Sequence, residues 1–327
     1  MKVGVSQHMK KRIMALGIAL MLVAGMFGES CYTKAKTKTD YSKYSNVKCG
    51  FGLSLNKDHK KPGCGLASGV KSLSDYNAYY CDTKAAKKKK KIIYLTFDCG
   101  YENGNTKTIL KILKKNKVKA IFFVTEPYIK ANPKLVKKMK KDGHLVGNHT
   151  CTHPQLPTKS VSQIRNEVKN CEKTMKKLTG YKMDRYIRPP QGCYSQRTLK
   201  VLQDMGYSTM FWSLAWHDWD IHNQPGKSTV VNMFKTYYHP GMMPLIHVVS
   251  KSDTEALPDI IKFMKDKGYK FGEVSDFALR PGEKAAKKAK KTTQKTKTKT
   301  TTDKTQTSAT TTVTTEAETT AASVTAE

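Results

Sequence analysis

Acidic residues are scarce in this chain of 327 residues. Its 26 Asp and Glu stand against 59 Lys and Arg, which leaves a formal net charge of +33. A surface of this sign attracts polyanions or an anionic envelope, although a lysine-rich solubilising surface is the simpler interpretation. The chain does not pair its basic residues with the aromatic side chains on which nucleic-acid modules stack bases. We therefore expect no nucleic-acid partner.

The chain also lacks an apolar run of full transmembrane length near its start. Residues 13–27 form an uncharged apolar run that is short for a membrane-spanning helix, and the basic residues 10–12 precede it. This arrangement predicts a signal peptide or signal anchor over residues 1–30, with cleavage or lipidation at Cys31 left open. We expect an exported protein of the cell envelope or extracellular space, anchored to the membrane if the segment is not cleaved.

Large apolar residues are nearly absent from residues 281–327, which are mainly Thr, Lys and Ala. Such a segment cannot bury enough surface to offset the entropy of ordering it, so we predict a disordered tail. Residues 31–91 are polar and poorly periodic, which predicts an N-terminal extension that wraps a core. The eight cysteines do not show the spacing of a small disulfide scaffold, and their pairing stays open.

The segment 92–280 has the pattern of a folded domain. Strand-like apolar runs alternate with helical patterns, of which residues 164–178 make the clearest apolar stripe, with Gly180 as the stop signal. Alternation of this kind predicts an α/β fold with a parallel sheet, and seven units predict a distorted or incomplete barrel. The strand-like runs are residues 92–97, 120–124, 144–147, 185–188, 207–212, 243–247 and 269–272.

Polar residues gather directly after five of these runs. Because the carboxyl ends of parallel strands meet at one edge, five successive clusters at that end predict a single active site. The clusters are residues 96–101 (TFDCGY), 149–153 (HTCTH), 188–192 (RPPQG), 216–219 (WHDW) and His247.

Four of these side chains suit the hydrolysis of an amide. The reaction needs a base that takes a proton from water, and Asp98 at a strand end can serve, although an Asp there can also simply cap a turn. Arg188 would hold Asp98 ionised and oriented. His247 is the natural acid for the leaving nitrogen, and Asp218 would raise its pKa and keep it protonated. An isolated histidine in such a run is more often a core residue.

His149 and His153 are four residues apart, a spacing that can place two imidazoles on one metal ion. Cys99 offers a third ligand, and a thiolate with two imidazoles suits zinc. Cys99 can equally be a small buried residue that fills a gap in the core.

In this order the motifs resemble those of the polysaccharide deacetylases with a NodB-type catalytic domain, over residues 92–277. The resemblance implies a distorted (β/α)7 barrel of the NodB homology type that removes N-acetyl groups from chitin, peptidoglycan or xylan. It implies Asp98 as the base, braced by Arg188, and His247 as the acid, tuned by Asp218. It also implies these further residues: metal ligands His149 and His153, the backbone N–H of Gln191 as oxyanion donor, and Trp219, Leu245 and Tyr101 at the substrate.

A narrower set of motifs resembles the delta-lactam-biosynthetic de-N-acetylases of spore formers. The resemblance implies action on N-acetylmuramic acid in the glycan strands of spore-cortex peptidoglycan, by a protein we expect to be a monomer. The alternatives are a deacetylase of N-acetylglucosamine or chitooligosaccharides and a non-catalytic cationic wall-binding protein. The matching segments are residues 50–54 (GFGLS), 98–106 (DCGYENGNT), 188–190 (RPP), 218–219 (DW) and 245–250 (LIHVVS).

Cys99 is the main departure from the family pattern, which usually has Asp at this position. Loss of that carboxylate removes a hard anionic ligand. Two predictions follow: either zinc is bound by Cys99, His149 and His153, or a divalent metal is held weakly by the two histidines. We favour a metal on the two histidines, with zinc as the first candidate.

Overall fold

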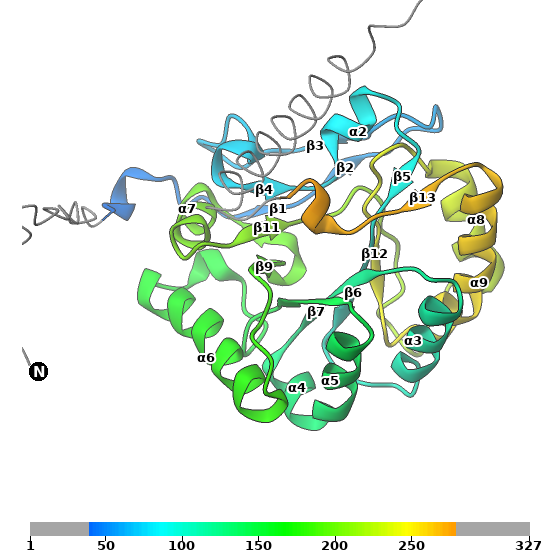
Figure 1. Cartoon of the computed structure of the whole chain (residues 1–327). Coiled ribbons are helices and arrows are strands. Elements are labelled where there is room, and N and C mark those ends of the chain that lie inside the picture. The colour runs from blue at the N-terminus through cyan, green and yellow to red at the C-terminus, as the bar shows by residue number, and fades with distance from the viewer. Residues whose placement is uncertain (1–38, 279–327) are drawn as a thin grey trace, which may run out of the picture. The chain divides into compact units, whose positions relative to one another are not determined.

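The computed structural model describes residues 39–278, and a curled seven-stranded sheet lies at its centre (Figure 1). The strands pair in the order β12-β6-β7-β8-β9-β11-β4, and all of these pairs are parallel. Within the described residues the outer strands β12 and β4 do not pair with each other, which leaves the predicted barrel open. The strands are β4 (Ala78–Tyr79), β6 (Leu95–Cys99), β7 (Ala120–Val124), β8 (Leu145–Asn148), β9 (Tyr186–Ile187), β11 (Ser208–Met210) and β12 (Leu245–His247).

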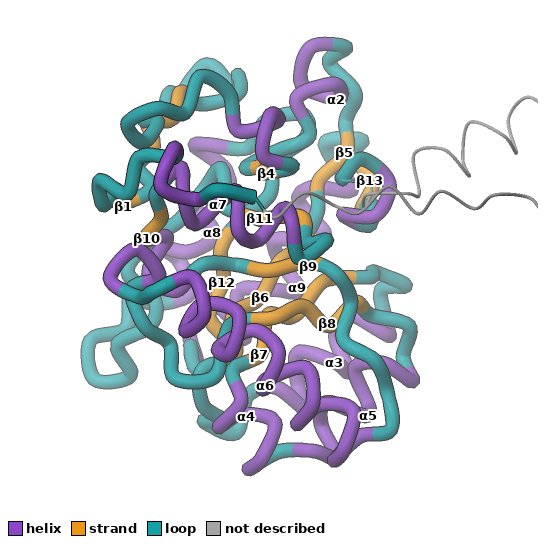
Figure 2. Tube along the Cα trace, turned by 90° about the vertical axis from the view of Figure 1, so that its left-hand side faces the viewer, coloured by secondary structure: helices purple, strands orange, loops and turns teal. Residues whose placement is uncertain are grey.

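Helices alternate with these strands and pack on the outer face of the sheet (Figures 1 and 2). Each parallel pair needs a crossover, and in this chain helices supply most of them. The helices are α2 (Thr83–Lys87), α3 (Thr106–Lys115), α4 (Glu126–Ala131), α5 (Pro133–Lys141), α6 (Val161–Thr179), α7 (Gln196–Asp204), α8 (Lys227–Tyr237) and α9 (Lys251–Asp266).

Helix α6 shows how directly the sequence sets an element. The apolar stripe at residues 164–178 turns its large side chains into the core. Ser160 and Gln163 form a reciprocal capping box at the amino end, and Gly180 ends the helix with a φ of 79° that favours glycine. The predicted stripe and stop of this helix are confirmed, and the capping box at its start was not predicted.

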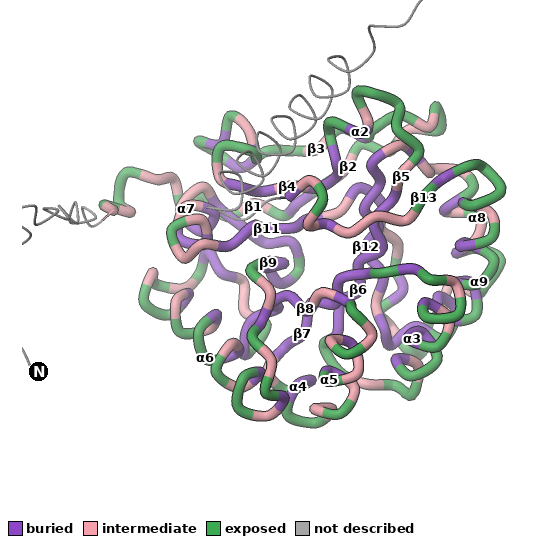
Figure 3. The backbone as a smooth tube through the Cα atoms, in the orientation of Figure 1, coloured by how far each residue is buried: buried purple, intermediate pink, exposed green. Residues whose placement is uncertain are grey.

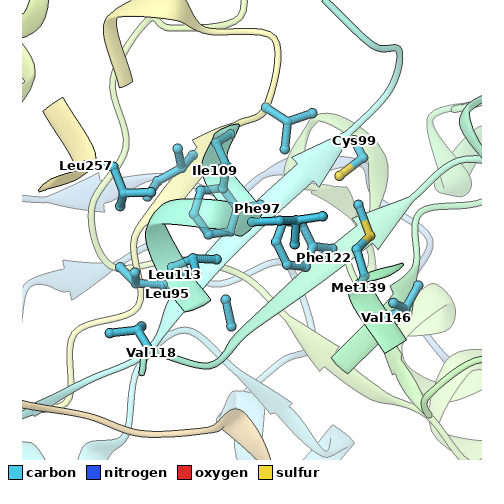
Figure 4. Close-up of a cluster of buried hydrophobic side chains, with 14 of the residues drawn as sticks. Leu95, Phe97, Cys99, Ile109, Leu113, Val118, Phe122, Met139, Val146 and Leu257 are labelled. Carbon is cyan, nitrogen blue, oxygen red and sulfur yellow. The ribbon is translucent and has the colours of Figure 1, made fainter. Parts of the chain in front are cut away.

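Strand β6 separates the core from the site by the alternation of its side chains. Leu95, Phe97 and Cys99 belong to the large apolar cluster beneath the helices, where Figure 4 draws them among side chains such as Ile109 and Leu113 of α3. Thr96 and Asp98 lie between them in the sequence and turn to the other face. Successive residues of a strand point to opposite sides, so Asp98 and Cys99 cannot share one face.

The sheet takes one strand from an unexpected place. The predicted strand at residues 269–272 is β13 (Lys270–Phe271), which pairs with β5 (Ile92–Ile93) outside the large sheet. The seventh sheet strand is instead β4, which pairs with β11 and comes from the segment predicted to be a polar extension. The predicted domain boundary at residue 92 therefore falls inside the folded unit.

The rest of that segment packs beside β11. β1 (Cys49–Gly50) pairs antiparallel with β10 (Cys193–Tyr194), and a short hairpin joins β2 (Leu53–Ser54) to β3 (Gly63–Cys64). The buried Phe51 ring stacks on Phe211, which directly follows β11, with 4.3 Å between centroids. Figure 3 shows β11 as buried tube. In the described part of the chain, no helix is long and apolar enough to cross a membrane. The predicted signal segment and disordered tail lie outside it.

Candidate active site

A cavity of about 1080 Å³ opens at the carboxyl ends of the parallel strands. The predicted clusters meet here, because every strand of the sheet presents the same end to this side. Eight of the eleven predicted site residues line the cavity: Asp98, Tyr101, His149, His153, Gln191, Trp219, Leu245 and His247. Arg188 and Asp218 lie fully buried behind two of them, and Cys99 lies apart.

Asp98 is held by a buried arginine. Nη1 of Arg188 donates to Oδ1 of Asp98 at 2.7 Å, and Nη2 donates to the Thr96 hydroxyl at 2.7 Å. Two backbone carbonyls at the end of β11, those of Met210 and Phe211, accept from Nε and Nη2 of Arg188 at 3.2 Å and 3.0 Å. Burial lowers the pKa of Arg188, but arginine stays charged at any pH relevant to a protein. The Asp98 carboxylate therefore sits beside a fixed positive charge with its second oxygen toward the cavity.

Two histidines converge next to Asp98. Nε2 of His149 lies 3.2 Å from Nε2 of His153 and 3.5 Å from Oδ2 of Asp98. Nδ1 of His149 lies 2.8 Å from the Arg188 carbonyl oxygen, which can only accept, so the proton is on Nδ1 and Nε2 carries the lone pair. Burial lowers the pKa of His149 to about 4 and also lowers that of His153, so both rings are neutral near pH 7.

The loop that carries these histidines is strained and braced. Thr150 and His153 have φ values of 69° and 56°, in the left-handed region that residues with a Cβ rarely adopt. Glu167 of α6 accepts from the backbone N–H groups of Cys151 and Thr152 at 2.9 Å and 2.8 Å, and so fixes the loop. Backbone strain held this firmly is typical of a functional loop.

His247 is paired with a fully buried carboxylate. Its Nδ1 donates to Oδ1 of Asp218 at 2.6 Å, and its backbone N–H donates to Oδ2 at 2.8 Å. Burial opposes the charging of His247, but the adjacent Asp218 outweighs it, so the pKa of His247 is raised. The same pairing lowers the pKa of Asp218 against its burial. The imidazole is therefore oriented with Nε2 free of this pairing and is biased toward its protonated form.

The base and acid candidates are neighbours across two strands. β12 pairs with β6 in the register that sets His247 opposite Asp98, and both line the same cavity. A carboxylate paired with a guanidinium and an imidazole whose pKa is raised thus face one space. That pairing can remove a proton from water on one side and deliver one to a leaving nitrogen on the other.

Comparison with known proteins identifies the family. A family profile described as polysaccharide deacetylase matches residues 85–210. The peptidoglycan-N-acetylmuramic acid deacetylase PdaA of Bacillus subtilis is 41% identical over 231 residues, which are 70% of this chain and 85% of that protein. The chain belongs to the polysaccharide deacetylase family. The reaction of this family is the hydrolysis of a carbon–nitrogen bond.

Solved structures of polysaccharide deacetylases agree with the fold. The structure of Bacillus subtilis PdaA, described as a family 4 carbohydrate esterase, matches with a TM-score of 0.67 and 40% identity, over 71% of this chain and 97% of that chain. BA3943 of Bacillus anthracis, described as a family 4 pseudoenzyme, matches with a TM-score of 0.54 and 31% identity, over 58% of this chain and 66% of that chain. Since the fold also supports a pseudoenzyme, activity has to be inferred from the reacting groups of this chain.

Cys99, where the polysaccharide deacetylases usually have Asp, is not placed to bind a metal. Its side chain is fully buried in the apolar cluster on the helix side of β6, away from the two histidines. Burial, followed by the nearby acids Asp98 and Glu102, raises the pKa of the thiol well above its usual range, so no thiolate forms at neutral pH. The prediction of a zinc site with Cys99 as third ligand is therefore wrong for this structure.

The two histidines still suit a divalent cation. Both rings are neutral, and the Nε2 lone pair of His149 is directed at His153 by the hydrogen bond to the Arg188 carbonyl. In the described residues, no group of three or more His, Cys, Asp and Glu side chains is arranged to hold a metal ion. The donor set is two imidazoles, with Asp98 as the nearest carboxylate, so water or substrate would complete the coordination.

Aromatic side chains wall the cavity of this polysaccharide deacetylase, and the sequence pattern had singled out only part of them. Trp219 and Tyr101 line the cavity and are about half exposed, and their predicted contact with substrate stays a prediction. Trp216 of the predicted cluster 216–219 also lines the cavity. Trp212 lines it too, and its position directly after β11 is the signal that could have identified it. Gln191, with a φ of 57°, also lines the cavity, and its predicted oxyanion role stays a prediction.

Proposed function

We propose that this polysaccharide deacetylase removes the acetyl group from N-acetylmuramic acid residues in peptidoglycan glycan strands, in the spore cortex. The observation that carries the proposal is the register that sets Asp98 opposite His247 at the mouth of one cavity, each with its own buried counter-charge. The 41% identity to an N-acetylmuramic acid deacetylase supports this choice of sugar.

The reaction follows from the two reacting groups. Asp98 takes a proton from a water molecule, whose oxygen forms a bond to the acetyl carbon. The tetrahedral oxyanion is stabilised by the Gln191 backbone N–H; loss of one such donor typically costs a factor of about 100 to 1000 in rate. His247 gives its proton to the nitrogen as the carbon–nitrogen bond breaks. The products are acetate and a free amine on the sugar.

We also propose that His149 and His153 hold a divalent cation, with zinc as the first candidate. Such an ion would polarise the acetyl carbonyl and lower the pKa of bound water. Two neutral imidazoles are typical zinc ligands, and the carbonyl that fixes the His149 tautomer is the kind of outer partner that metal-binding histidines have.

The sugar can be tested with purified protein. Acetate release is measured on glycan strands without stem peptides, on peptide-bearing peptidoglycan and on chitooligosaccharides, and the products are examined by mass spectrometry. The proposal predicts deacetylated muramic acid from the peptide-free strands, where the free amine can close on the lactyl carboxylate to form muramic-δ-lactam. Deacetylation confined to N-acetylglucosamine or chitooligosaccharides would instead support the alternative substrate.

We propose export to the cell envelope as the setting for this activity. The supporting feature is the basic residues 10–12 followed by the apolar run 13–27. Fractionation of the native host would place the protein outside the cytoplasmic membrane or attached to it, and mass determination of the mature chain distinguishes a cleaved signal from an anchor. Recovery of the full-length chain in the cytoplasm would refute export.

A further inference from the structure

A second carboxyl group lies behind the Asp218–His247 pair. Asp253 sits in the first turn of α9, is 4% exposed, and lies close enough to Asp218 for each carboxyl group to shift the pKa of the other. The Trp216 indole N–H donates to its Oδ1 at 3.1 Å, while its own backbone N–H donates to the Ser250 hydroxyl at 3.1 Å. Its Oδ2 is buried and receives no hydrogen bond from a donor group anywhere in residues 39–278.

Two buried carboxylates that interact this strongly cannot both be charged at modest cost. Like charges at this separation push one pKa up until that group keeps its proton, as in carboxylate dyads. The hydrogen-bond donors decide which one. Asp218 receives two N–H groups from His247, one of them from a ring whose pKa is raised, whereas the Trp216 indole that donates to Asp253 is neutral. The proton therefore belongs on Asp253, where it also satisfies the buried oxygen.

We propose that Asp253 is a positioning residue that stays protonated and donates a hydrogen bond from its carboxyl group to the Asp218 carboxylate, which in turn orients His247. Burial followed by the contact with Asp218 raises the pKa of Asp253 well above its usual range, in agreement with this assignment. The role deepens the proposed function, and its direct test does not depend on that function.

The protonated state of Asp253 sets the charge around the acid. With Asp253 neutral, Asp218 and His247 together carry no net charge. An ionised Asp253 would add a second anion beside Asp218, raise the pKa of His247 further and make its proton harder to deliver. Asp98, Arg188 and His153 also act on His247 and are the same in either case: Asp98 and His153 line the cavity with it, and Arg188 lies buried behind Asp98.

The proton can be observed directly in the resting protein. Infrared difference spectroscopy near pH 7 should show the carbonyl stretch of a protonated carboxyl group in the wild-type chain and its loss in Asp253→Asn. The matched control is Asp259→Asn on the same helix, where the carboxylate is half exposed and paired with Lys227; it should leave the band in place. Absence of the band from the wild-type protein, or its survival in Asp253→Asn, overturns the proposal.

The kcat, KM and pH–rate profile of Asp253 variants test the positioning role independently of the infrared band. Asn keeps a neutral N–H donor, so Asp253→Asn should retain the alkaline limb of the pH–rate profile and most of the kcat. Leu has no donor, so Asp253→Leu should lose about tenfold to hundredfold in kcat with little change in KM. A loss of this size corresponds to the removal of one hydrogen bond to a charged group. Equal kcat for the two variants, or an alkaline limb that moves to lower pH in Asp253→Asn, contradicts the proposal.

The two readouts separate this inference from the proposed function. The infrared band requires no substrate, so a wild-type protein that shows the band but releases no acetate would refute only the proposed function. A wild-type protein that releases acetate without the band would refute only the role of Asp253. If Asp253→Leu does not fold, as judged by circular dichroism, the infrared comparison and Asp253→Asn still decide.

Discussion

Replacement of Arg188 by Met is expected to lower the free energy of unfolding of the domain substantially. The side chain is fully buried and donates to Asp98, to Thr96 and to two carbonyl oxygens. Met fills part of the volume but has no hydrogen-bond donor. The buried Asp98 carboxylate is therefore left without its positive partner. Removing one member of a buried ion pair typically costs about 3–5 kcal/mol, a large share of the roughly 5–15 kcal/mol by which domains are stable.

The same reasoning predicts that a second substitution restores part of the stability lost in Arg188→Met. Asp98→Asn removes the stranded charge, so the double variant should be more stable than Arg188→Met alone. Urea unfolding at pH 7, followed by circular dichroism, gives the free energies. Arg185→Met is the control, because Arg185 is about half exposed, is paired with Glu172 and should cost less than about 1 kcal/mol. Additive losses from the two site substitutions would refute the account of Arg188 as the counter-charge of Asp98.

Three further predictions concern the acid, the metal and the stability of the fold. Asp218→Asn removes the carboxylate that raises the pKa of His247, so the alkaline limb of the pH–rate profile should move to lower pH; an unchanged limb contradicts the pairing. Cys99→Ser should leave the bound metal per chain unchanged by elemental analysis, whereas His149→Ala should reduce it; the reverse pattern would restore Cys99 as a ligand. Burial lowers the pKa of His144 to about 4 from about 6.5 when unfolded, so the unfolded chain binds more protons in this window. The protonation of His144 alone should therefore cost about 3 kcal/mol of stability as pH drops from 6.5 to 4. An unfolding free energy that falls just as steeply with pH in His144→Gln would refute this.

The alternation of strands and helices was enough to predict the fold class but not every strand. Long apolar runs such as residues 120–124 became sheet strands as expected. β4 has only two residues and no apolar run to mark it, and it joins the sheet through β11, which is about 130 residues away. Residues 270–271 form a strand as predicted, but this strand pairs with β5 and not with the seven-stranded sheet. Pairing between distant short segments depends on the packing of the whole chain.

The candidate site was predicted where local pattern and strand direction agree. Parallel strands carry their polar clusters to one edge, which brought Asp98, His149 and His247 together. The error at Cys99 came from neglecting the period of two within β6, since a neighbour of an inward-facing Asp98 must face the helices. Asp253 had no signal in the sequence, because its contact with Asp218 arises only from the docking of α9 against the loop that follows β11.

The most direct test of the whole account is acetate release from stem-peptide-free glycan strands by the wild-type protein and by Asp98→Asn, at a temperature where circular dichroism shows both to be folded. The account predicts steady acetate release with exposure of the muramic acid amine for the wild type, and none above background for Asp98→Asn. Release of acetate by Asp98→Asn at the wild-type rate would contradict the assignment of this carboxylate as the base on which the proposed reaction depends.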